Sequence, residues 1–299
     1  MARKRRGRRL NGWIVLDKPE GLTSTRAVAA VKRLFDAAKA GHAGTLDPLA
    51  TGILPIALGE ATKVVARIVD STKEYRFELR WGEERDTDDA DGAVVATSER
   101  RPSPAEVAAV LPRFLGEIEQ TPPVYSAIKV AGERAYDLAR EGRPAELAPR
   151  QVRIDRFERL DDGADPERAR FLVACGKGAY IRALARDLGR LLDCRAYVSA
   201  LRRTRVGPFS EAEAISLDNL QALRHKGALD DALRPVEAAL ADIPALTVTG
   251  SEAARLKSGQ AVRVPSTMQG TVCAMVDGRP VALALIESGE VRPVRVFNL

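Results

Sequence analysis

The feature that most limits the possible folds is a change in sequence pattern close to residue 240. Before this point, segments typical of strands and helices alternate without the regular spacing of β-α-β units, which favours an α+β fold over a doubly wound parallel sheet. After it, short apolar segments typical of strands surround one helical pattern, Glu252–Lys257, and a turn at Asp277-Gly278. This pattern predicts a small β-barrel module over residues 245–299, joined to the rest of the chain near Ile243-Pro244.

Several local patterns assign elements in the first part of the chain. Over Lys73–Trp81, aromatic and apolar residues alternate with charged ones, as expected for a half-buried strand. Ser103-Pro104 followed by Glu106 combines a helix cap, a first-turn proline and a capping-box glutamate, which predicts the start of a helix. Apolar residues at helical spacing predict a helix over Tyr180–Leu192, and the segment Val124–Val130 is interpreted as a strand.

The positive charge of the chain is concentrated at its beginning. The formal net charge is +6, and residues 1–9 contain six basic residues and no acidic one. The other residues hold 41 basic and 41 acidic side chains, so they are formally neutral. We therefore expect residues 1–9 to be a disordered basic tail that favours a polyanion such as RNA or DNA, with a solubilising extension as the alternative.

If the remainder of the chain also binds nucleic acid, its charges must be segregated. Residues 82–92 carry six acidic side chains and one basic side chain, whereas Leu201–Val206 contains three arginines and no acid. These two segments are the clearest sign of such segregation in the sequence.

The composition excludes several classes of protein. Hydrophobic residues make up 45% of the 299 residues, which is typical of a globular protein. No apolar run approaches the ~20 residues that a membrane helix needs, and no secretory signal follows the basic start. Three separated cysteines and two histidines provide no pattern for a metal site, and P-loop and G-x-S-x-G motifs are absent. The expected protein is cytoplasmic and binds neither a metal nor a membrane.

The glycine-rich segment 41–52, GHAGTLDPLATG, is the richest in residues that could carry chemistry. Its three glycines allow close approach of the backbone to a ligand. Pro48 disfavours the helical conformation at Asp47, so the carboxylate projects from a stiff turn. From local chemistry alone, Asp47 is more often a carboxylate that caps its own backbone, and His42 is more often a packed loop residue.

The segment GHAGTLDPLATGILPIALGEATK, residues 41–63, resembles the catalytic motif of the bacterial tRNA pseudouridine-55 synthases, the TruB family. Four further segments are similar to blocks of that family and follow in its order. They are NGWIVLDKPEGLTS (11–24), KEYRFELRWGEERDTDDADG (73–92), TPPVYSAIKVAGERAYDLAREG (121–142) and KGAYIRALARDLG (177–189). The resemblance covers about residues 10–210.

This resemblance implies a specific domain organisation. Residues 10–244 would form a pseudouridine-synthase catalytic domain of the α+β class, with a large mixed, mainly antiparallel sheet. Within it, an insertion at about residues 123–150 would grip RNA. Residues 245–299 are similar to the PUA-like domain of the family, and would form a small RNA-binding β-barrel.

The resemblance also implies an activity, namely isomerisation of the uridine at position 55, in the T loop of tRNA, to pseudouridine. The reaction breaks the C1′–N1 bond and rejoins the base through C5, so it needs no cofactor. The positions that match functional residues of the family are Asp47 as the catalytic carboxylate, and His42, Tyr75, Tyr180, Arg182 and Leu201 as substrate-binding residues. His42 would fill the space left by a base that has flipped out of the RNA stack, and Asp89 could orient the arginines of the site.

Other interpretations stay open at this level. Arg182 alone could be an exposed helix residue, and Tyr75 and Leu201 could be ordinary core residues. The chain could be an RNA-folding or ribosome-assembly protein that keeps the scaffold, or a related synthase that acts on another RNA. We expect a monomer that acts on the T arm of tRNA without a guide RNA, because the PUA-like module and the insertion favour stand-alone use.

Overall fold

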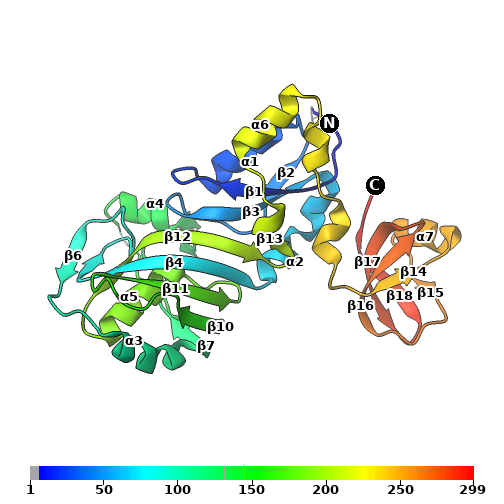
Figure 1. Ribbon diagram of the computed structural model, residues 1–299. Helices are drawn as coiled ribbons and strands as arrows, with labels where there is room; N and C mark the ends of the chain where they lie inside the picture. The colour runs from blue at the N-terminus through cyan, green and yellow to red at the C-terminus, as the bar shows by residue number, and fades with distance from the viewer. Residues whose placement is uncertain (1–6, 131, 144) are drawn as a thin grey trace.

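The computed structural model describes residues 7–130, 132–143 and 145–299, and it contains one large sheet and one smaller C-terminal sheet (Figure 1). The large sheet has nine strands, and its main path runs β1-β3-β12-β4-β11-β10-β7. These strands are β1 (Gly12–Lys18), β3 (Thr51–Leu58), β12 (Ala196–Val206), β4 (Lys73–Trp81), β11 (Arg168–Cys175), β10 (Arg150–Arg159) and β7 (Gly116–Gln120). Two short strands complete it, since β2 (Ala40–His42) pairs with β3 and β13 (Phe209–Ser210) pairs with β12.

All strand pairs in this sheet are antiparallel except β12 with β3, which are parallel. The expected α+β fold with a large mixed, mainly antiparallel sheet is therefore confirmed. The parallel pair matters for the site, because it places Arg202 and Arg203 of β12 beside Thr51 and Gly52, just after the glycine-rich segment.

The alternation predicted over β4 is confirmed. Phe77, Leu79 and Trp81 are buried, whereas Arg76 and Arg80 on the other face are exposed. The buried side chains join one apolar cluster with residues of α1 (Ser24–Leu34), α3 (Pro104–Val110) and α5 (Ile181–Leu191). The predicted capping box is present at α3, where the Ser103 side chain accepts a hydrogen bond from the Glu106 backbone N–H. These helices therefore cover the face of the sheet to which the apolar side of β4 points.

The predicted strand Val124–Val130 is wrong over most of its length. Only β8 (Lys129–Val130) is a strand, and it pairs with β9 (Glu133–Arg134) ahead of α4 (Ala135–Arg140). Two prolines precede this segment, and proline offers no N–H to a sheet. The carbonyl oxygens of Tyr125 and Ser126 accept hydrogen bonds from Arg182 and from the Tyr136 N–H instead of from a neighbouring strand.

Shorter elements connect the sheet strands. They are α2 (Val65–Asp70), α6 (Leu217–His225), the hairpin of β5 (Glu83–Arg85) and β6 (Val94–Thr97), and the 3₁₀ helices η1 (Gly59–Val64), η2 (Leu111–Phe114), η3 (Glu211–Glu213), η4 (Leu229–Ala232) and η5 (Val236–Leu240). In the described part of the chain, no helix is long and apolar enough to cross a membrane.

The C-terminal sheet has five strands in the order β14-β16-β17-β18-β15, with α7 (Gly250–Lys257) packed against it. The strands are β14 (Ala245–Thr247), β16 (Gly270–Val276), β17 (Arg279–Glu287), β18 (Glu290–Val296) and β15 (Val262–Arg263). This agrees with the expected small β-barrel module, and because no pairing between β14 and β15 closes the sheet among the described residues, the module is a half barrel. Phe297 and Leu283 join a buried cluster with Val64, Ile68 and Leu240, which packs this sheet against the rest of the molecule.

The prediction of a disordered tail is wrong at Arg8. The Arg8 N–H donates to the Asp36 carbonyl oxygen, and its own carbonyl accepts from Ala38 at 2.9 Å. Its guanidinium also pairs with Asp230. Chain connectivity explains the difference, because the residues next to β1 can reach the end of α1 and pair with it. Residues 1–6 of the predicted tail lie outside the described residues.

Candidate active site

The structure pairs the two residues at the centre of the predicted site. Asp47 lies in the loop between β2 and β3, and Arg182 lies in the first turn of α5. The Arg182 Nε donates to the Asp47 Oδ2 at 2.9 Å. The Arg182 side chain is 5% exposed and that of Asp47 is 33% exposed, so the carboxylate has one side held by protein and one side open. Arg182 is therefore not an exposed helix residue, and the hydrogen bond described for the Asp47 carboxylate comes from Arg182 rather than from its own backbone.

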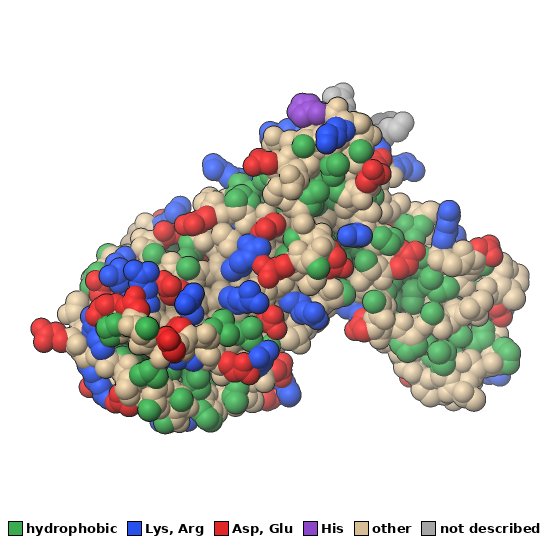
Figure 2. Space-filling model, in the orientation of Figure 1, with side chains coloured by type: hydrophobic (Ala, Val, Ile, Leu, Met, Phe, Trp, Pro, Cys, Tyr) green, Lys and Arg blue, Asp and Glu red, His purple; other side chains and the backbone are tan. Residues whose placement is uncertain are grey.

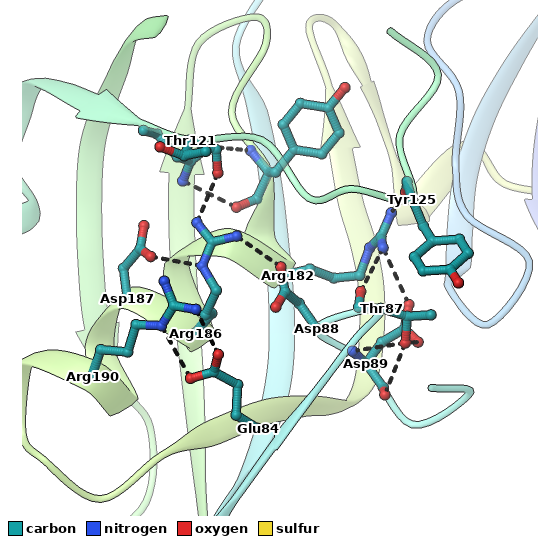
Figure 3. A network of polar contacts seen from close by, with 12 residues as sticks. Glu84, Thr87, Asp88, Asp89, Thr121, Tyr125, Arg182, Arg186, Asp187 and Arg190 are labelled. Atoms are coloured by element: carbon teal, nitrogen blue, oxygen red, sulfur yellow. Dashed lines mark hydrogen bonds and ion pairs between the residues drawn. The ribbon is translucent and has the colours of Figure 1, made fainter. Parts of the chain in front are cut away.

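Arg182 is held in place through its two other nitrogens. Nη1 donates to the Thr87 carbonyl oxygen at 2.7 Å and lies 3.5 Å from the Asp89 Oδ2, and Nη2 donates to the Tyr125 carbonyl oxygen at 2.9 Å (Figure 3). Burial disfavours the charge of Arg182, but Asp47, Asp89 and Asp88 outweigh this effect and raise its pKa. The site thus contains a permanent cation in a fixed orientation beside Asp47.

The two tyrosines predicted to contact substrate lie close enough to Asp47 for its charge to act on them. Burial raises the pKa of Tyr75 on β4, and the nearby Arg203 guanidinium works against this rise. Burial also raises the pKa of Tyr180, which directly precedes α5. The backbone of Tyr180 is fixed by the Gln120 side chain, through hydrogen bonds of 2.8 and 3.2 Å. Both phenols are therefore protonated at neutral pH.

Leu201 and His42 have different surroundings. Leu201 lies on β12 opposite Phe77 and is buried in the main apolar cluster. His42 lies on β2 opposite Ile56, and its buried Nδ1 has no hydrogen-bond partner among the described residues. Burial, followed by the charge of Arg203, lowers the pKa of His42, so its imidazole is neutral. No hydrogen bond in the described part of the chain connects His42 to Asp47.

Two buried cations that hold the Asp47 loop were missed by the sequence analysis. Arg203 is 1% exposed, and its guanidinium donates to the carbonyl oxygens of Ile53, Thr45 and Gly44. Lys18 is fully buried and donates to the carbonyl oxygens of three residues, which are Pro19, Leu22 and Pro48. Burial lowers the pKa of Lys18 to about 8, although Asp47 raises it. The two cations fix the backbone on both sides of Asp47.

Ion pairs and burial reduce the expected segregation of charge in the two segments on which it was based, although Arg205 stays exposed. Within Leu201–Val206, Arg203 is buried and Arg202 pairs with Asp17 and Glu211. In the acidic segment 82–92, three of the six acids, Glu84, Asp88 and Asp89, face arginines of α5. Figure 2 shows acidic and basic side chains interspersed over the visible face of the large sheet. The pairs form across residues far apart in the sequence, so a charge count along the chain cannot reveal them.

Comparisons with family models identify most of the chain. Residues 32–181 match the model described as TruB family pseudouridylate synthase, N-terminal domain. Residues 182–241 match the model described as tRNA pseudouridylate synthase B C-terminal domain. The matched residues thus contain the Asp47 loop, β4, α5 and β12, and they end before the C-terminal sheet.

Similar curated proteins extend over the whole chain. A protein of Bradyrhizobium diazoefficiens named tRNA pseudouridine synthase B is 59% identical, covering 99% of this chain and 88% of its own length. A protein of Rhodospirillum rubrum with the same name is 50% identical over 100% of both chains.

Solved structures share the fold. A chain in the structure of an H/ACA ribonucleoprotein bound to a substrate RNA containing 2′-deoxyuridine matches with a TM-score of 0.74 and 26% identity, covering 100% of this chain and 92% of that chain. A chain of a Cbf5-Nop10-Gar1 complex matches with a TM-score of 0.72 and 28% identity, covering 96% of this chain and 84% of that chain. The family models and the full-length relatives agree with the geometry of the site: this chain belongs to the TruB family of pseudouridylate synthases.

Proposed function

We propose that this protein isomerises uridine to pseudouridine in tRNA, that its target is uridine 55 in the T loop, and that Asp47 is the catalytic carboxylate. Membership of the family and the name shared by the full-length relatives support the reaction and the class of RNA. The observation that carries the role of Asp47 is its 2.9 Å contact with the buried Arg182, since this pair presents a half-open carboxylate beside a fixed cation.

The chemistry requires few groups. The C1′–N1 bond breaks, a C1′–C5 bond forms, the proton on C5 leaves and N1 gains a proton, so no oxidant or reductant takes part. A carboxylate serves this reaction by attacking C6 or C1′, or by removing a proton to give a glycal. The Arg182 guanidinium stays beside the Asp47 carboxylate when RNA closes over the site, so it compensates for the water that this charge loses.

The remaining substrate-binding residues form the walls around the base in this proposal. Tyr75 stacks on the target base, and it is the candidate that receives the proton from C5. Because its raised pKa keeps the phenol protonated at neutral pH, this step needs a partner that first takes up the phenolic proton. Tyr180 lines the other side next to Asp47, and Leu201 closes the apolar side.

RNA binding requires the base to leave its stack, at a cost of a few kcal/mol. We assign His42 to the space that the base vacates, since a neutral imidazole can stack between bases. The insertion at about residues 123–150 would grip the T arm, and the module at residues 245–299 would act as a PUA-like RNA-binding domain. Recognition of this kind depends on the shape of the folded loop and on backbone contacts.

We propose that the protein acts as a cytoplasmic monomer without a guide RNA. The comparisons support the absence of a guide RNA, because the relatives that are 50–59% identical are named as tRNA enzymes, whereas the match to the H/ACA ribonucleoprotein chain is 26% identical.

The proposal can be tested with tRNA transcripts that carry tritium at C5 of uridine. Pseudouridine formation at position 55 releases this tritium to water, so wild-type protein should release one equivalent per tRNA. A transcript with cytidine at position 55 should release none. Tight binding of tRNA without release would favour the RNA-folding alternative, and undiminished release from the cytidine-55 transcript would move the target to another uridine.

A further inference from the structure

Helix α5 carries a row of three arginines that extends beyond the proposed catalytic pair. Arg182, Arg186 and Arg190 are spaced four residues apart, so they lie on one face of the helix. Each faces an acid of the segment 84–89. Arg190 pairs with Glu84, Arg186 pairs with Asp88 at 2.9 Å, and Arg182 lies 3.5 Å from Asp89 (Figure 3).

Two of these pairs are buried, and in the third the arginine is half exposed. The side chains of Arg186 and Asp88 are 8% and 7% exposed, close to the 5% and 6% of Arg182 and Asp89. The Arg190 side chain is 50% exposed. A buried ion pair costs desolvation that a hydrophobic pair would not, so folding alone gives little reason to keep one. The Arg186–Asp88 pair therefore needs another explanation, although neither residue touches Asp47 in the described contacts.

The partners of Arg186 supply that explanation. Its Nη1 holds Asp88, which lies between Thr87 and Asp89, and its Nη2 donates to the Thr121 carbonyl oxygen at 2.7 Å. Thr121 begins the segment that leads to Tyr125. Apart from Asp47, the groups that orient Arg182 are the Thr87 carbonyl, Asp89 and the Tyr125 carbonyl. One guanidinium thus holds both segments that supply these groups.

The backbone at Asp88 supports the same conclusion. Asp88 has a φ of +60°, a left-handed conformation that costs energy for a residue with a side chain. Its carbonyl accepts a hydrogen bond from the Val198 N–H on β12 at 3.1 Å, and its N–H donates to the Arg85 carbonyl at 3.0 Å. The tight turn places the Asp88 carboxylate towards Arg186 while its neighbours Thr87 and Asp89 face Arg182.

We infer that Arg186 and Asp88 are a positioning pair, which fixes the orientation of the Arg182 guanidinium and through it the Asp47 carboxylate during pseudouridine formation. The inference rests on the proposed function and adds to it two residues that act without touching the substrate. Loss of either partner leaves α5 and the large sheet in place but frees the Thr87–Asp89 turn to move relative to Arg182.

The test compares conservative variants of the full-length protein. Arg186→Lys keeps the positive charge but not the planar guanidinium that donates to two partners at once. Asp88→Asn keeps the shape of the side chain, and asparagine tolerates a left-handed backbone. Each should lower the single-turnover rate at saturating tRNA by roughly tenfold or more, with the Kd for tRNA nearly unchanged, when measured at a temperature where circular dichroism shows the variant to be folded. Arg190→Lys, on the same helix face but exposed, is the matched control and should stay within about twofold of wild type.

A second comparison distinguishes positioning from a purely structural role. If Arg186 acts through Arg182, adding Arg186→Lys to Arg182→Lys should slow the reaction by less than about threefold further, so the two effects are not additive. Wild-type rates in Arg186→Lys or Asp88→Asn, or full additivity in the double variant, would overturn the inference. A wild-type protein that forms no pseudouridine in tRNA would instead overturn the proposed function.

Discussion

The large sheet and the C-terminal sheet differ in what their interiors contain. The charged side chains that are buried in the described residues are Lys18, Lys73, Glu84, Asp88, Asp89, Arg182, Arg186 and Arg203, all of which belong to the part with the large sheet. The interior of the C-terminal sheet is formed by aliphatic side chains such as Leu256, Val272 and Ile286. Both parts bury apolar clusters, so the buried charges are an addition to a core that already exists.

This difference indicates that the buried charges serve the chemistry of the site, whereas the apolar clusters stabilise the fold. Burying a charge is unfavourable unless hydrogen bonds and opposite charges compensate for it. In the large-sheet part, all of these buried charges except Lys73 and Glu84 contact the Asp47 loop or belong to the network around the Thr87–Asp89 turn, where they fix the backbone and side chains of the site. We therefore expect substitutions there to affect rate more than stability, and substitutions in the C-terminal core to do the opposite.

The largest effect should follow from Asp47→Asn. The amide has nearly the same shape as the carboxylate, so the protein should fold and bind tRNA, but it has no anionic oxygen for nucleophilic attack or proton removal. We expect no detectable pseudouridine, with a Kd within about twofold of wild type. Product analysis and filter binding on the same preparation measure both quantities. Turnover close to that of wild type would show that Asp47 is not the catalytic residue.

Arg182→Lys should have the next largest effect. An ammonium cannot contact Asp47, the Thr87 carbonyl and the Tyr125 carbonyl together, as the guanidinium does. The single-turnover rate should fall by roughly 100-fold, the size of effect seen when one preorganised hydrogen-bond donor is removed from an active site. Circular dichroism and the melting temperature provide the control for folding. A rate near that of wild type would contradict the role of the buried cation.

Ile286→Ala should lower the stability and leave the rate unchanged, the opposite of what is expected for the two active-site variants. Ile286 is fully buried in the C-terminal cluster, and its truncation leaves a cavity. The variant should lose about 2–5 kcal/mol of unfolding free energy in the C-terminal part. At a temperature where the protein remains folded, the rate at saturating tRNA should match wild type. A large loss of rate under those conditions would mean that the C-terminal core also positions the site.

The smallest effect concerns the basic start of the chain. Deleting residues 2–6 removes four cations, Arg3, Lys4, Arg5 and Arg6. If these bind phosphates, tRNA binding should weaken at low salt, and the slope of log K against log salt should decrease by about 0.7–0.9 for each phosphate that is no longer neutralised. The modified uridine should not change. Arg8→Ala, which removes a cation already paired with Asp230, is the matched control. Equal slopes for the deletion and wild type would favour the solubilising alternative.

The sequence predicted those parts of the fold that depend on local pattern. Such local patterns each indicate one element. They are the alternation over β4, the capping box at Ser103 and the helical spacing of α5. Strand β7, with Ile118 as its one large apolar residue, has no comparable pattern and was not predicted. Helix α6 was also missed, because its local pattern is weak and its packing against α1 is a long-range contact.

The difference between local pattern and long-range contact also explains which residues of the site could be predicted. Asp47 and Arg182 were proposed from a family resemblance, but their contact spans 135 residues and only the fold brings them together. Arg203 and Lys18 carry no local sign of burial, since a lysine or arginine in a single sequence is expected to be exposed. Their partners are backbone carbonyl oxygens, which no residue type in the sequence can indicate.

The most direct test of the account is to map pseudouridine in tRNA after reaction with purified protein. The tRNA is treated with a carbodiimide that marks pseudouridine, digested, and analysed by mass spectrometry of the T-loop fragment. The account predicts one pseudouridine per tRNA, at position 55, with wild-type protein and none with Asp47→Asn. A product at another position, no product with wild type, or the same product with Asp47→Asn would contradict it.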